Sequence, residues 1–129
     1  MTCGKGHAMS RPIITWATAA LLLLPLSAAA GEAVVVDVEA APEAAGSWRF
    51  SVTVRHPDTG WDHYADKWQV LGPDGTVLGE RVLLHPHVDE QPFTRSLSGV
   101  AIPSGMEQVT VRAHDSVDGW GPEVTVALP

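Results

Sequence analysis

Apolar and polar residues alternate one by one over residues 47–55, where every even position is apolar and every odd position polar. This period of two is typical of a β-strand with one buried face. Similar runs predict six further strands, at residues 33–40, 64–71, 76–84, 93–102, 107–114 and 123–128. Clusters of Gly, Pro and Asp separate these runs and predict turns. No stretch has the period of an amphipathic helix, so the predicted fold class is all-β.

Seven short strands within residues 31–129 predict a single antiparallel sandwich of two sheets. Trp48 and Trp68 fall on the second and third strands, and the run Val109-Thr110-Val111-Arg112-Ala113 is followed by the loop Asp118-Gly119-Trp120-Gly121. In this pattern the chain resembles the immunoglobulin and fibronectin type III group of β-sandwiches, among small exported bacterial proteins. It lacks the two cysteines of immunoglobulin domains. The resemblance implies a seven-stranded sandwich, a fold that serves many functions and selects none.

The first 30 residues have a different character from the rest. Residues 13–26 are apolar, follow Lys5 and Arg11, and precede the small residues of positions 27–30. This is the pattern of a secretory signal peptide, with cleavage expected after Ala30 and Met9 as an alternative start. The apolar run is short for a membrane span, which needs roughly 20 residues. We therefore expect a periplasmic or secreted protein without a membrane span after cleavage. No cysteine lies at the cleavage site, so lipid attachment is not expected.

Charge and cysteine content narrow the function further. Residues 31–129 contain all 15 acidic side chains and 6 of the 8 basic ones, a formal charge of −9. The bases are scattered singly among carboxylates, so nucleic acid is not an expected partner. The only cysteine is Cys3, in the expected leader. Disulfides, thiol catalysis and thiolate metal ligands are therefore excluded for the mature domain.

The histidines give the most informative signal. If successive connections alternate between the two ends of the sandwich, the loops at residues 56–63, 85–92 and 115–122 share one end. All five histidines of the mature chain belong to that end: His56, His63, His85, His87 and His114. Carboxylates accompany them, with Asp89 and Asp115 as candidate supporting groups. Imidazole together with carboxylate suits Zn(II) or Cu(II), which predicts a metal site there.

Two details bear on how the histidines are arranged. In His85-Pro86-His87 an extended backbone would direct both rings to the same side, with the proline stiffening the link. Strand phase predicts that His63 and His114 face outward on neighbouring third and sixth strands, as a cross-strand pair. The same histidines could instead serve as a pH sensor, or as loop residues that only form hydrogen bonds.

Two tryptophans, Trp61 and Trp120, fall in loops at the same end, where they either cover strand ends or form a partner-binding patch. The chain has no Gly-x-Ser-x-Gly turn and no phosphate-binding loop, and a domain this small has little room for a deep cleft, so an enzyme is not expected. The leading hypothesis is an exported binding protein that holds Cu(II) or Zn(II), with His85 and His87 as central ligands. The alternative is a non-catalytic interaction module that recognises a protein or cell-envelope partner through these loops.

Overall fold

The computed structural model describes residues 31–129, and the expected signal peptide with its cleavage site lies outside the described residues. The described chain folds into strands with one short 3-10 helix, η1 (Ala44–Gly46), in the first turn. The strands are β1 (Val34–Pro42), β2 (Ser47–Arg55), β3 (Ala65–Leu71), β4 (Val77–Val82), β5 (Phe93–Ala101), β6 (Gln108–Asp115), β7 (Gly119–Trp120) and β8 (Val124–Ala127).

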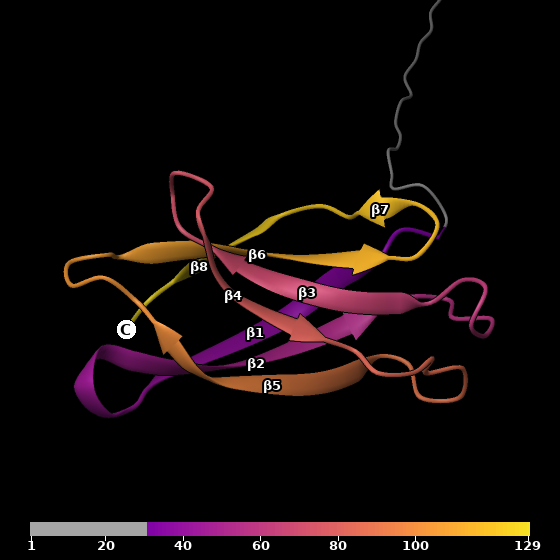
Figure 1. The fold of residues 1–129 in the computed structure, drawn as a ribbon, viewed down its shortest axis with the longest axis horizontal. Coiled ribbons are helices and arrows are strands. Elements are labelled where there is room, and N and C mark those ends of the chain that lie inside the picture. The colour runs from indigo at the N-terminus through magenta and orange to yellow at the C-terminus, as the bar shows by residue number, and fades with distance from the viewer. Residues whose placement is uncertain (1–30) are drawn as a thin grey trace, which may run out of the picture.

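The strands form two antiparallel sheets packed face to face (Figure 1). One sheet has the order β1-β2-β5, and the other has the order β4-β3-β6-β7, with β8 also paired to β6. The predicted all-β sandwich is confirmed, and so is the expected pairing of the third and sixth strands. The predicted strand count is wrong: residues 31–129 form eight strands, not seven.

The extra strand is the two-residue β7, in a segment whose Gly and Pro content predicts a turn. β7 and β8 pair with the same edge of β6, at its end and its beginning respectively. Between them lies Pro122, which has no backbone N–H to donate to a ladder. One edge strand is therefore interrupted, and a two-residue strand is too short to show an alternating pattern.

The core lies between the two sheets and follows the predicted alternation. In β2, Phe50, Val52 and Val54 are fully buried, and they pack in one apolar cluster with Trp68 of β3 and Val111 of β6. Burial of such side chains contributes roughly 1.5–3 kcal/mol each. The strands next to the candidate site, β2, β3 and β6, are thus held in place by packing between the two sheets. Among the described residues no helix is long and apolar enough to cross a membrane.

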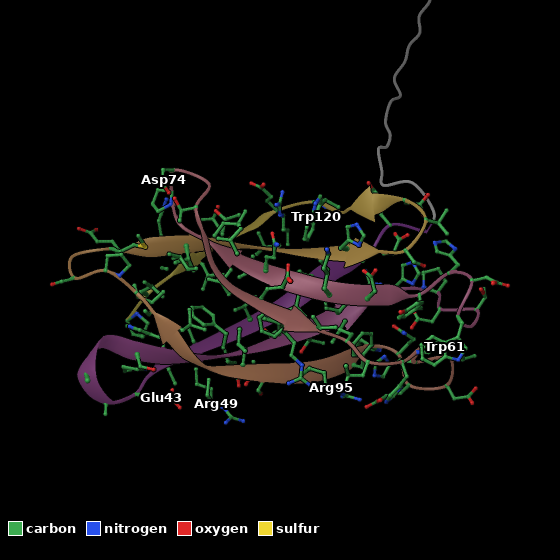
Figure 2. All side chains as sticks on the ribbon, in the orientation of Figure 1. Glu43, Arg49, Trp61, Asp74, Arg95 and Trp120 are labelled. Atoms are coloured by element: carbon green, nitrogen blue, oxygen red, sulfur yellow. The ribbon has the colours of Figure 1, made fainter. Side chains whose placement is uncertain are left out.

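The three loops at residues 56–63, 85–92 and 115–122 meet at one end of the sandwich, as expected. His87 of the β4–β5 connection donates its backbone N–H to Asp58 of the β2–β3 connection. Asp118, which follows β6, lies 3.1 Å from the His63 ring. Figure 2 shows Trp61 at this end and Glu43 toward the other. The loop arrangement on which the histidine argument depends is therefore present.

Candidate metal site

Two side chains of the site are placed by strand phase. The even positions of β2 face the core, and the next even position after Val54 is His56. The odd positions of β6 face the core, and after Ala113 the last of them is Asp115. Both polar side chains are fully buried, because each continues an inward-facing series. The two sheets thus bring an imidazole and a carboxylate together at the same end of the core.

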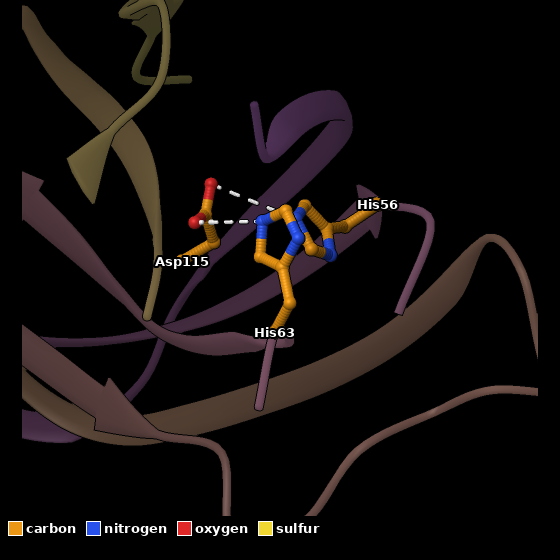
Figure 3. Close-up of side chains that lie close together, drawn as sticks. All are labelled: His56, His63 and Asp115. Atoms are coloured by element: carbon orange, nitrogen blue, oxygen red, sulfur yellow. Dashed lines mark hydrogen bonds and ion pairs between the residues drawn. The ribbon is translucent and has the colours of Figure 1, made fainter. Parts of the chain in front are cut away.

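His63 reaches this place because of an irregularity in β3. The pairing of β3 with β6 shifts register between Ala65 and Lys67, so that Ala65 and Trp68 both face the core. An extra residue in a strand moves the preceding side chains to the opposite face. The expectation that His63 faces outward is therefore wrong. Its ring is directed toward His56 and Asp115 (Figure 3).

The three side chains form a compact cluster. One ligand atom from each of His56, His63 and Asp115 lies within 4.8 Å of the others, so the cluster could hold a metal ion. His63 Nε2 is 3.2 Å from Asp115 Oδ1, and His56 Nε2 is 3.6 Å from Asp115 Oδ2. Ligands at 2.0–2.1 Å from a tetrahedral Zn(II) are about 3.3 Å apart. The two separations between histidine nitrogens and Asp115 oxygens lie close to that spacing.

Asp58 sets the orientation of His56. A carboxylate only accepts, so the 2.5 Å contact between His56 Nδ1 and Asp58 Oδ1 places the proton on Nδ1. The lone pair of neutral His56 is then on Nε2, which faces Asp115. A metal-binding histidine usually donates its other ring N–H to a carboxylate or carbonyl in this way. The His56 ring is thus preset in the tautomer that binds a metal.

One carboxylate oxygen of Asp115 accepts hydrogen bonds, and the other has no hydrogen-bond partner. Its Oδ1 accepts the backbone N–H groups of Val117 at 2.8 Å and Asp118 at 2.6 Å. Its Oδ2 is buried without a hydrogen-bond partner, and so is His56 Nε2. A buried polar atom without a partner is costly, and here two electron-rich atoms face each other. A cation between them would satisfy both.

The solvent side of the cluster is formed by His63 and Asp118. Their side chains are 25% and 35% exposed, and His63 Nε2 lies 3.1 Å from Asp118 Oδ2. With carboxylate oxygens of Asp115 and Asp118 both near it, this nitrogen donates a proton when no metal is bound. A metal ion would take the place of that proton. Asp118 is then available as a further ligand, directly or through water.

His85 and His87 lie in the β4–β5 loop, outside the cluster. His87 is buried, its ring stacks on Phe93 with centroids 3.9 Å apart, and both its ring nitrogens lack a hydrogen-bond partner. Burial lowers the pKa of His87, and the positive charge of Arg95 and the neighbouring His85 lower it further. His85 is exposed, and its Nδ1 contacts the carbonyl of Pro86 at 3.0 Å.

His114 takes part in a separate pair. Its partner across the ladder is Lys67, so the expected cross-strand pair of His63 and His114 is not formed. Instead His114 Nδ1 donates to Asp66 Oδ1 at 2.6 Å, and the ring meets Trp120 edge to face with centroids 4.8 Å apart. This group lies on the outer face of the larger sheet, where it is half-buried.

The remaining predicted residues differ in exposure. Asp89 is exposed in the β4–β5 loop. Trp120 is half-buried beneath Arg112, whose guanidinium carbon lies 3.9 Å from the ring centre. Trp61 is 67% exposed, and its ring lies at 71° to that of Tyr64 with centroids 5.5 Å apart. Of the two tryptophans, Trp61 is the one that presents a free aromatic surface.

Asp58 and Asp118 also contact the histidines of this cluster, and neither is among the site residues predicted from the sequence. The position of His56 and Asp115 at the ends of inward-facing series was a usable signal. The short sequence His56-Pro57-Asp58 was another, because a carboxylate two residues from a histidine can bond its ring.

No family model matches the chain, and no solved structure matches it. The chain is similar to a protein of Halomicrobium mukohataei named "Putative lipoprotein", with 45% identity over 95 residues. The matched region is 74% of this chain and 46% of that protein. The chain therefore spans about half the length of the relative.

Proposed function

We propose that the protein is an exported domain that binds one divalent transition-metal ion, Zn(II) or Cu(II), through His56, His63 and Asp115. The observation that carries the proposal is the pair of buried, unpartnered atoms, His56 Nε2 and Asp115 Oδ2, that face each other at 3.6 Å. Two imidazoles and a carboxylate form a ligand set that Zn(II) commonly has, and imidazole also suits Cu(II).

The proposed role is to hold or deliver the ion. His56 and Asp115 are enclosed by the core, and the described residues form no pocket beside them for a substrate. Export is supported by the signal-peptide pattern of residues 1–30 and by the name of the Halomicrobium relative. The strand order β1-β2-β5 against β4-β3-β6-β8 supports membership of the immunoglobulin and fibronectin type III group, which we also propose.

Metal analysis with a matched pair of histidine variants tests the proposal. The untagged protein is exposed to Zn(II) or Cu(II), desalted and analysed for retained metal. We expect one ion per chain, lost in His63→Ala and retained in His85→Ala, because only His63 belongs to the cluster. Stoichiometric binding lost in His85→Ala but not in His63→Ala would place the ion in the β4–β5 loop and overturn this assignment. Absence of retained metal in the unsubstituted protein would overturn the function.

A second candidate, an interaction module, is favoured by the exposure of Trp61. Large exposed aromatic side chains are frequent at binding surfaces, and Leu84 and Val88 of the β4–β5 loop are exposed as well. The partner would be a protein or cell-envelope component. Capture from an envelope extract by the unsubstituted protein but not by Trp61→Ala, with the metal content unchanged, would support this function.

A further inference from the structure

We propose that Asp58 is a positioning residue that links the metal site to the β4–β5 loop (residues 83–92), so that metal binding stabilises that loop. The inference rests on the proposed function. The β4–β5 loop carries the exposed apolar residues Leu84 and Val88. Metal binding would therefore regulate the stability of a loop that presents an apolar surface.

Asp58 is buried and accepts hydrogen bonds from three separate segments. Its Oδ1 accepts from His56 Nδ1 at 2.5 Å and from the backbone N–H of Ala65, at the start of β3, at 3.1 Å. Its Oδ2 accepts the backbone N–H of His87 at 2.7 Å. One carboxylate therefore touches the ring of a metal ligand with one oxygen and the loop with the other.

Gln91 forms a second connection between the same two places. Its Oε1 accepts the backbone N–H of His56 at 2.9 Å, and its Nε2 donates to the carbonyl of His87 at 2.9 Å. Both backbone groups of His87 are thus bonded to side chains that also bond His56. The conformation of the loop at His87 depends on where His56 and Asp58 are held.

A metal ion on His56 Nε2 acts on this chain of bonds. The ion withdraws electron density from the imidazole, so Nδ1–H becomes a stronger donor to Asp58. A stronger bond holds the carboxylate more firmly and keeps Oδ2 aimed at the His87 amide. We expect fewer local opening motions of the loop when metal is bound, which amide hydrogen exchange measures.

The first test needs no substitution. Amide hydrogen exchange is measured by NMR on the protein with and without saturating Zn(II). We expect exchange at the His87 amide to slow at least tenfold with Zn(II), and exchange in the β1–β2 turn at the opposite end to stay unchanged. Zn(II) binding without slower exchange at His87 would overturn the link and leave the proposed function intact. Failure to bind Zn(II) or Cu(II) would overturn the proposed function, and the link with it.

The second test uses Asp58→Asn, with Asp66→Asn as a matched control. The asparagine keeps one accepting oxygen but replaces the other with an NH2 group that cannot accept the His87 N–H. We expect Zn(II) affinity to fall 10- to 100-fold, the range found when such supporting groups are removed. Asp66 makes the same kind of bond to His114, outside the site, so Asp66→Asn should leave Zn(II) affinity unchanged.

Imidazole nitrogen chemical shifts distinguish positioning from general support of the fold. In the unsubstituted protein without metal, His56 should show the Nδ1–H tautomer, and Asp58→Asn should increase the Nε2–H form. A loss of stability in Asp58→Asn with an unchanged tautomer and unchanged Zn(II) affinity would show that Asp58 only supports the fold, and would overturn the proposal.

Discussion

Two pairs of histidines at the same end of this molecule are equally close but chemically different. The rings of His56 and His63 have centroids 4.8 Å apart, and those of His85 and His87 are 4.7 Å apart. The first pair meets edge to face at 77°, with a ring nitrogen of each directed at Asp115. The second pair is tilted by 36°, with one ring sealed against Phe93 and the other in solvent.

The difference shows that closeness of two histidine rings does not by itself bring potential metal ligands together. A ligand set needs lone pairs that converge and a partner for the remaining ring nitrogen. His56 meets both requirements. Asp58 accepts the proton on its Nδ1, which leaves the lone pair on Nε2, facing Asp115. His87 has neither, since both of its ring nitrogens are buried without partners.

Removing the Asp115 side chain should have the largest effect, because it should reduce stability and prevent metal binding. In Asp115→Ala the backbone N–H groups of Val117 and Asp118 lose their acceptor, and metal binding is lost. Val117 and Asp118 are exposed, so each lost hydrogen bond should cost about 0.5–1.5 kcal/mol, and the free energy of unfolding without metal should fall by about 1–3 kcal/mol. Urea denaturation measures this. Asp89→Ala is the control, because Asp89 is exposed and should change stability by less than about 0.5 kcal/mol. Equal effects of the two substitutions would contradict the assignment.

Added metal should stabilise the protein only through the first histidine pair. At a free Zn(II) concentration of 100 times Kd, a single site adds about 2.7 kcal/mol to the free energy of unfolding. Thermal denaturation with and without Zn(II) should show this gain in the unsubstituted protein and in His85→Ala, and no gain in His63→Ala. A gain of the same size in His63→Ala would show that the ion binds elsewhere.

His87, in the second histidine pair, should instead make the stability of the protein depend on pH. The pKa of His87 in the folded protein is lowered from the usual 6.5, mainly by burial, so the unfolded chain binds a proton more readily. This contribution to stability is fully present above about pH 6.5 and decreases as the pH falls toward the lowered pKa. His87→Phe keeps an aromatic ring against Phe93 and should flatten that part of the profile. A profile unchanged by this substitution would show that another group is responsible.

The smallest effect is expected at Trp61. Its ring is mostly exposed, so Trp61→Ala should change the free energy of unfolding by less than about 0.5 kcal/mol and leave Zn(II) affinity unchanged. Calorimetric titration and urea denaturation together measure both. A large loss of stability would show that Trp61 covers the strand ends rather than presenting a surface.

The fold was predictable from the sequence because its strands alternate clearly. The limits of β2 match residues 47–55, and Phe50, Val52 and Val54 are buried as expected. The clustering of the histidines at one end of the sandwich was predictable as well, because successive connections alternate between its two ends. β7 was not, because Gly119 and Trp120 are too few to show a period.

Which of these histidines form the candidate metal cluster was not predictable. His-Pro-His is conspicuous in the sequence, but His87 is turned inward against Phe93, where it bonds Gln91 of the same loop and Asp58, which is distant in sequence. The orientation of His63 depends on a register shift in β3 that no local residue pattern predicts. Both outcomes are decided by tertiary contacts, which act over the whole sandwich rather than along one strand.

The interruption of the edge strand between β7 and β8 affects how copies of this protein can associate. An open strand edge presents unpaired N–H and C=O groups that can recruit a second chain into a growing sheet. Here that edge of the larger sheet breaks between Trp120 and Val124, and Pro122 removes a donor within the break. This edge of the larger sheet therefore offers no long continuous template, which disfavours pairing with a second chain along it.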